Sequence, residues 1–147
     1  MSNLLSERTR GRLEAYLSSR PDVVAAILFG SRARGEERKG SDLDIGILLT
    51  REQAQAGVNR SQLVTDLMEV FGRADVDAVI LNDAPPLLQH RVVRDGHVLY
   101  SRDDGAVAEF TVRAIQRYED TRPLRKLQAE QLRRRLALHR SEREGSS

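Results

Sequence analysis

The segment spanning residues 27–49 constrains the fold of this 147-residue chain more than any other. It reads ILFGSRARGEERKGSDLDIGILL, which predicts a strand, a tight turn with a polar segment, and a second strand. Gly30 and Ser31 stand at the expected end of the first strand, and ten residues separate Ser31 from Asp42. Because alternate side chains of a strand share a face, Asp42 and Asp44 are expected to point the same way. The segment therefore predicts a site for a metal ion and phosphate.

Apolar runs and helical periods alternate along the rest of the chain. Strands are predicted at residues 23–29, 42–49, 75–81 and 97–100, and helices at residues 5–19, 52–71, 85–93, 104–118 and 124–139. Gly57 weakens the first half of the helix at 52–71, Gly72 is expected to end it, and Asp83 is expected to cap the next helix. The pattern predicts an α/β (α+β) fold, with a small mixed sheet of three to four strands and flanking helices.

Composition bounds the class of protein. Hydrophobic residues make up 39% and charged residues 31% of the chain, as in a polar globular domain. The absence of cysteine excludes disulfides and thiolate metal sites. The N-terminus lacks the apolar core of a signal peptide, and no run is long enough to span a membrane. We therefore expect a cytoplasmic protein with no membrane partner.

Positive charge is concentrated near the C-terminus. Residues 122–143 carry eight basic and two acidic side chains, whereas the whole chain has a net charge of +2. This asymmetry predicts a slightly acidic domain at residues 1–120 and a basic helical arm at 121–147, whose last residues, 141–147, are expected to be disordered. The arm is interpreted either as a docking surface for an acidic partner or nucleic acid, or as a solvated helix face.

The residues around the predicted turn suit a phosphate group. Gly30 has no Cβ, so its backbone can approach a ligand closely. Ser31 can donate through its hydroxyl and its amide, and a helix beginning there would point free N–H groups at an anion. Arg32 and Arg34 add positive charge nearby and are secondary candidates for phosphate binding.

Carboxylates on the following strands suit a divalent cation. Asp42 and Asp44 provide hard oxygen ligands of the kind that Mg²⁺ prefers. An attacking hydroxyl also needs a group that accepts its proton, and Asp77 in the third strand is the best candidate. Asp75 shares the strand face of Asp77 and competes for this role, but it lies nearer the start of the strand.

Together, GSRARG followed by SDLD resembles the Gly-Ser, ten-residue, Asp-x-Asp signature of the nucleotidyltransferases of the DNA polymerase β superfamily. VDAVILN resembles the later acidic strand of that family, which places its third aspartate at Asp77. The following APPLLQHRVVRDGHVLY resembles the helix, turn and strand that close the minimal nucleotidyltransferases, or MNT proteins. The resemblance covers roughly residues 5–120 and implies the polymerase β-like nucleotidyltransferase fold.

The resemblance also implies an activity and a partner. MNT proteins transfer AMP from ATP, with Mg²⁺, and many act as antitoxins that adenylylate a tyrosine of a HEPN ribonuclease toxin. Nucleic acid is not expected to be the main partner. Carried over to this sequence, the catalytic and metal-binding residues are Asp42, Asp44 and Asp77, and the nucleotide-binding residues are Gly30, Ser31, Arg32 and Arg34.

Three alternatives remain open at this point. The chain could act as a binding module that sequesters its partner without catalysis. It could also transfer AMP to a small molecule or to an RNA hydroxyl. Arg134 and His139 match the Arg-x4-His pattern of the HEPN ribonucleases themselves, but such a match arises easily in an arginine-rich chain, and the chain lacks room for the helical bundle that the motif needs.

Overall fold

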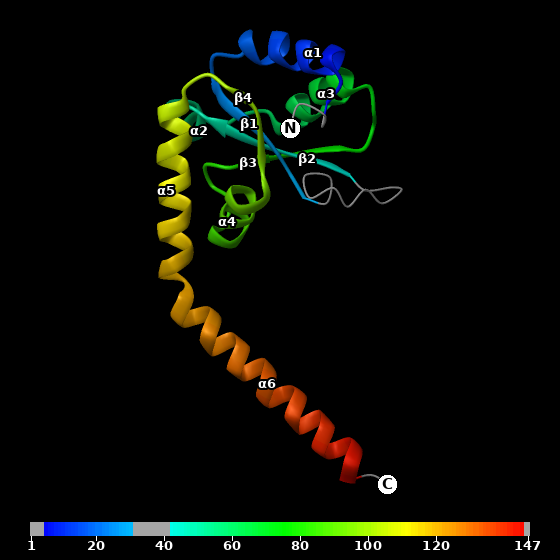
Figure 1. Ribbon diagram of the computed structural model, residues 1–147, viewed down its shortest axis with the longest axis vertical. Helices are drawn as coiled ribbons and strands as arrows, with labels where there is room; N and C mark the ends of the chain where they lie inside the picture. The colour runs from blue at the N-terminus through cyan, green and yellow to red at the C-terminus, as the bar shows by residue number, and fades with distance from the viewer. Residues whose placement is uncertain (1–4, 31–41, 146–147) are drawn as a thin grey trace.

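The computed structural model shown in Figure 1 describes residues 5–30 and 42–145. In these residues the elements follow one another as α1 (Glu7–Ser18), β1 (Val23–Phe29), β2 (Leu43–Leu49), α2 (Arg51–Ala56), α3 (Arg60–Phe71), β3 (Val76–Ile80), α4 (Pro86–Asp95), β4 (His97–Ser101), α5 (Asp104–Asp120) and α6 (Arg122–Gly145).

The strands form one sheet in the order β3-β2-β1-β4. β1 pairs with β2 and with β4 in antiparallel fashion, whereas β2 and β3 are parallel. The sheet is therefore mixed and has four strands in the described part of the chain. This confirms the predicted α/β class and the polymerase β-like arrangement of a small mixed sheet with flanking helices.

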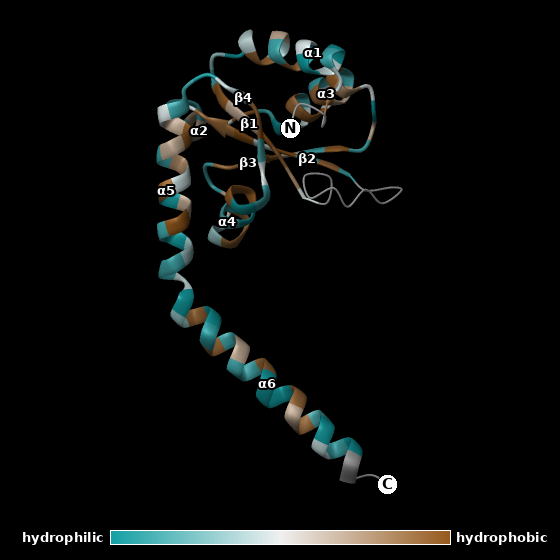
Figure 2. Cartoon of the chain, in the orientation of Figure 1, coloured by the Kyte–Doolittle hydropathy of each residue, from teal (hydrophilic) through white to brown (hydrophobic). Residues whose placement is uncertain are grey.

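The two central strands hold the hydrophobic core. Every residue of β1 is buried, as expected for a short apolar run covered on both faces. On one face, Leu28 and Ile45 pack in a cluster with Leu13 of α1 and Leu67 of α3. On the other face, Ile27 and Leu48 cluster with Val92 of α4 and Phe110 of α5. Figure 2 shows the resulting contrast between the apolar sheet and the more polar helices.

Local signals in the sequence explain most of the helix ends. The Ser6 hydroxyl accepts a hydrogen bond from the Thr9 amide at 3.2 Å and caps α1. Gly72 ends α3 in the left-handed conformation, at φ 66°, as expected. The single helix expected at 52–71 is two helices, because the chain turns at Gly57, with φ 90°, and Asn59 caps α3 with its side chain.

Two expectations are wrong, one about the start of α4 and one about the C-terminal tail. The side chain of Asp83 does not cap α4: Pro85 occupies the N-cap position, and no side chain forms a cap hydrogen bond there. A proline at this end of the helix fixes φ without needing a cap. The tail from 141 is not disordered through its described residues, because α6 continues to Gly145.

α6 leaves the body of the protein as an extended helix (Figure 1). Its start is fixed to α5 by Arg125, whose guanidinium group lies 3.7 Å from the centre of the Tyr118 ring and donates to the Tyr118 carbonyl. His90 of α4 stacks on the same ring at 3.6 Å. No residue of α6 from 122 to 143 is buried. The division into a domain at 1–120 and an arm at 121–147 stays a prediction. In the described residues no helix is long and apolar enough to cross a membrane.

Candidate functional site

Gly30 lies directly beside the carboxylate of Asp44. The antiparallel register places Phe29 opposite Asp44, so the end of β1 meets the start of β2. Gly30 follows with φ 85°, a left-handed conformation that residues with a Cβ rarely adopt. A Cβ atom on Gly30 would come within 2.5 Å of Asp44 Oδ2. Glycine is therefore required here both for the turn and for the close approach of the backbone to the carboxylate.

Asp44 and Asp77 are neighbours across the parallel pair. The register of β2 and β3 places them side by side, on the same face of the sheet. Asp42, two residues before Asp44, is exposed. Burial raises the pKa of the Asp44 carboxyl above its ordinary value, and the negative charges of Asp77 and Asp42 raise it further. Asp44 is therefore close enough to both Asp42 and Asp77 to be affected by their negative charges.

Arg60, the first residue of α3, holds one oxygen of Asp77. Its Nη2 donates to Asp77 Oδ1 at 2.5 Å, and its Nε donates to the Ala78 carbonyl at 2.6 Å. The Ala78 amide also donates to Asp77 Oδ1, at 2.9 Å. Arg60 was not among the site residues predicted from the sequence. No local pattern marks it, because Asp77 lies 17 positions further along the chain and only the packing of α3 on the sheet brings the two together.

The competing residue, Asp75, has different surroundings. It precedes β3, and its carboxylate forms an ion pair with Arg73. Its carbonyl accepts a hydrogen bond from the Leu43 amide at 2.7 Å, which helps join β2 to β3. Asp77 rather than Asp75 is thus the register partner of Asp44.

The remaining predicted site residues cannot be placed. Ser31, Arg32 and Arg34 lie outside the described residues, which resume at Asp42. Among the described residues, no group of three or more histidine, cysteine, aspartate or glutamate side chains is arranged to hold a metal ion. The donor chemistry of Asp42, Asp44 and Asp77 nevertheless fits a hard divalent cation, since a cation would offset the repulsion that raises the pKa of Asp44.

Comparison with known proteins identifies the family. The model of the family described as polymerase beta, nucleotidyltransferase matches residues 12–105, which include both strands that carry the aspartates. The chain belongs to this family. It is 28% identical over 123 residues to the protein adenylyltransferase MntA of Aphanizomenon flos-aquae, covering 79% of this chain and 82% of that protein.

Solved structures of the nucleotidyltransferase fold also match. A variant of the MntA toxin–antitoxin complex contains a chain 25% identical to this one, with a TM-score of 0.67, over 87% of this chain and 98% of that one. A complex of a tri-AMPylated Shewanella oneidensis HEPN toxin with an MNT antitoxin matches at 22% identity and a TM-score of 0.64, over 84% of this chain and 95% of that one. These neighbours confirm the polymerase β-like fold.

Proposed function

We propose that this nucleotidyltransferase transfers AMP from ATP to a tyrosine hydroxyl of a HEPN ribonuclease, and so acts as its antitoxin. The observation that carries the proposal is the alignment of Asp44 with Asp77 beside Gly30. It brings a carboxylate pair to the point where the chain turns into the Gly-Ser segment. That combination suits the transfer of a phosphoryl-type group better than binding alone.

The carboxylates would divide the chemistry between them. Asp42, Asp44 and Asp77 would hold Mg²⁺, which when bound neutralises charge on the triphosphate and on the leaving pyrophosphate. Asp77 would accept the phenolic proton as the tyrosine oxygen bonds to the α-phosphorus of ATP and the bond from that phosphorus to pyrophosphate breaks. Arg60 occupies Oδ1 of Asp77. In this role Asp77 must therefore either move away from Arg60 or use its other carboxylate oxygen, Oδ2, for the proton and the metal.

The turn would bind the rest of the triphosphate. Gly30 allows the backbone to approach the phosphates, and Ser31 would donate to the β- and γ-phosphate oxygens. Arg32 and Arg34 would add positive charge to the same region. The close contact of Gly30 with Asp44 would keep these phosphates next to the metal-binding carboxylates.

The relatives support the choice of acceptor and partner. MntA of A. flos-aquae is named a protein adenylyltransferase. The matched MntA chain comes from a toxin–antitoxin complex, and in the S. oneidensis complex the HEPN toxin carries AMP groups. A protein hydroxyl on a HEPN partner is therefore the acceptor we favour for this chain.

An AMP-transfer assay with variants tests the proposal. The protein is incubated with Mg²⁺, ATP labelled at the α-phosphate, and the HEPN protein encoded next to it. We expect label on the partner with the wild type and none with Asp44→Asn or Asp77→Asn. Asp75→Asn is the matched control and should keep activity, because Asp75 is paired with Arg73. Label transfer by Asp44→Asn, or loss of transfer only in Asp75→Asn, would refute the site.

Sequestration of the partner is a second candidate, and α6 is the observation that favours it. Five leucines of this helix, which has no core of its own, are more than half exposed: Leu124, Leu127, Leu132, Leu136 and Leu138. Most of the stability of a helix in a protein comes from packing of its apolar face, so these side chains are expected to pack on another surface. Full inhibition of the partner by the Asp44→Asn variant, without label transfer, would favour this candidate.

A further inference from the structure

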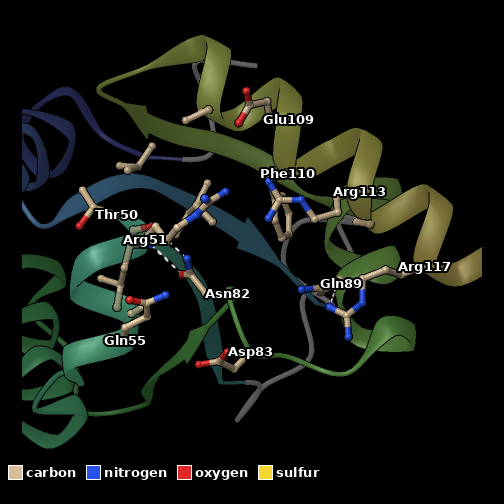
Figure 3. Close-up of a pocket in the computed structure, with 16 residues that line it drawn as sticks. Thr50, Arg51, Gln55, Asn82, Asp83, Gln89, Glu109, Phe110, Arg113 and Arg117 are labelled. Carbon is tan, nitrogen blue, oxygen red and sulfur yellow. Dashed lines mark hydrogen bonds between the residues drawn. The ribbon is translucent and has the colours of Figure 1, made fainter.

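A cavity of about 420 Å³ lies between α2, α5 and the segment that joins β3 to α4. Figure 3 shows Arg51 reaching it from α2, while Arg113 and Arg117 reach it from the facing wall. The floor is apolar and includes the buried side chains of Val24 and Phe110. A volume of this size accommodates a small organic molecule.

The cavity is at the far end of the sheet from the aspartates. Asp44 is the second residue of β2, whereas Leu48 and Leu49 at the end of that strand line the cavity. At about 3.3 Å per residue, Leu49 lies roughly 17 Å along the strand from Asp44. Neither Gly30 nor Asp77 lines it. The cavity is therefore separate from the site proposed for AMP transfer.

Three arginine side chains line this cavity. Arg51, Arg113 and Arg117 all line it, and none of them forms an ion pair within the described part of the structure. Asp83 and Glu109 also line the cavity, and neither forms an ion pair with these arginines in the described part of the structure. The lining therefore carries three guanidinium groups and two carboxylates, and guanidinium groups without an ion-pair partner suit carboxylate and phosphate oxygens of a ligand.

One of these arginines is held in position by a buried amide. Gln89 of α4 is only 4% exposed, and its Nε2 donates to the Leu81 carbonyl at 2.8 Å. This leaves Gln89 Oε1 to accept a hydrogen bond from Arg117 Nη1, also at 2.8 Å. Because the acceptor is neutral, Arg117 keeps its positive charge available to a ligand. The orientation of this guanidinium group is therefore set before any ligand binds.

The opposite wall is fixed in a similar way. Asn82 accepts a hydrogen bond from the Leu49 amide and donates to the Leu49 carbonyl, each at 2.9 Å. This pair joins the end of β2 to the segment after β3, next to Arg51. On α5, Phe110, Arg113 and Arg117 recur at the spacing of a single helix face. Charged ends and an aromatic ring therefore face one cavity with ordered walls.

We propose that this cavity binds a small organic anion, with a phosphate monoester or carboxylate held by Arg51, Arg113 and Arg117 and an apolar or aromatic body placed against Phe110. The anionic group matches the three guanidinium groups, and the apolar floor matches the body of the ligand. This goes beyond the proposed function, because it is a second ligand site on the same face of the sheet as the aspartates.

NMR titration of the full ¹⁵N-labelled chain tests this proposal, with phenyl phosphate, benzoate and inorganic phosphate as separate probes. We expect saturable shifts at the amides of residues 49–51, 82–83 and 110–117. Phenyl phosphate or benzoate should bind more tightly than inorganic phosphate, and the better of the two identifies the anionic group. Arg51→Gln and Arg113→Gln should each weaken binding at least about tenfold, since each removes charge-assisted hydrogen bonds.

The controls separate this site from general attraction to positive charge. The side chains of Arg51 and Arg113 make no hydrogen bond or ion pair in the described structure, so both variants are expected to fold. Arg133→Gln, on the exposed α6, should leave the affinity unchanged. Equal binding of inorganic phosphate, shifts confined to the region of Gly30 and Asp44, or wild-type affinity in both cavity variants would overturn the proposal.

Discussion

Arg60 donates a 2.5 Å hydrogen bond to the carboxylate of Asp77, the residue aligned with Asp44 across the sheet. This contact neutralises one of the three carboxylates on the face where negative charge accumulates. Both side chains are about half exposed, so the ion pair itself is worth no more than about 1 kcal/mol. Its larger effect is on how strongly the aspartates attract a cation.

Replacement of Arg60 should therefore strengthen metal binding. In Arg60→Gln, the Mg²⁺ concentration for half-maximal AMP transfer is expected to fall by roughly threefold to tenfold, because a positive charge leaves the site. The measurement is a Mg²⁺ titration of the transfer assay. Arg73→Gln is the control, since Arg73 pairs with Asp75 instead. An unchanged or higher Mg²⁺ requirement in Arg60→Gln would contradict this role.

Gly30 should tolerate no side chain. Gly30→Ala combines a positive φ of 85° with a Cβ that would meet Asp44 Oδ2 at 2.5 Å. Strain alone costs about 1–3 kcal/mol, and displacement of the carboxylate should also lower AMP transfer at least about 100-fold. Stability is measured by urea unfolding and activity by label transfer.

Gly57 offers the matched control for this prediction. It has a similar φ of 90°, but a Cβ there would meet nothing within 4 Å. Gly57→Ala should therefore share the loss of stability and keep the activity. If both variants lost activity equally, backbone strain rather than contact with Asp44 would be the cause.

The two central strands of the sheet, β1 and β2, were predictable because their signals are local. The apolar run at 23–29 and the Asp-x-Asp start of the next strand fix which residues face which side. The preference for Asp77 over Asp75 as the third carboxylate could also be argued from position within a strand, and Asp77 is the register partner of Asp44. The roles assigned to these residues still rest on the proposed function.

Other features depend on tertiary packing and left no local trace. Arg60 reaches Asp77 only because α3 packs on the sheet, and the cavity arginines come from two helices far apart in the sequence. The cap predicted at Asp83 is wrong because two prolines follow it closely, and Pro85 takes the N-cap position of α4 without a side-chain cap hydrogen bond. Sequence patterns describe single elements well, but they do not give the distances between elements.

Asp44 should make the protein less stable and its activity dependent on pH. The pKa of the Asp44 carboxyl is raised in the folded state. The shift therefore favours the folded state relative to the unfolded state at low pH, and this advantage is lost as the pH rises through the folded-state pKa. Asp44→Asn should therefore raise the free energy of unfolding at pH 7, because the folded protein no longer holds this partly buried charge near Asp77 and Asp42. Urea unfolding at pH 7 and pH 4 checks the sign.

The same pKa bears on metal binding in the wild type. Mg²⁺ binds the ionised carboxylate, so at Mg²⁺ concentrations below saturation AMP transfer should fall on the acid side at a higher pH than an ordinary aspartate would cause. Asp42→Asn removes one of the charges that raise the pKa, and its residual activity should fall off at a lower pH. A stability gain in Asp44→Asn that grows as the pH falls would contradict the assignment.

The exposed leucines of α6 should matter for the partner and not for the fold. Leu132 and Leu136 are 57% and 54% exposed, so Leu132→Ser with Leu136→Ser should change the unfolding midpoint of the domain little. If α6 docks on the HEPN partner, each buried leucine contributes about 1.5–3 kcal/mol, and the double variant should lose at least about 100-fold in affinity by calorimetry. Gln131→Ser, on the same helix, should bind like the wild type. Wild-type affinity in the double leucine variant would show that the partner does not use this face of α6.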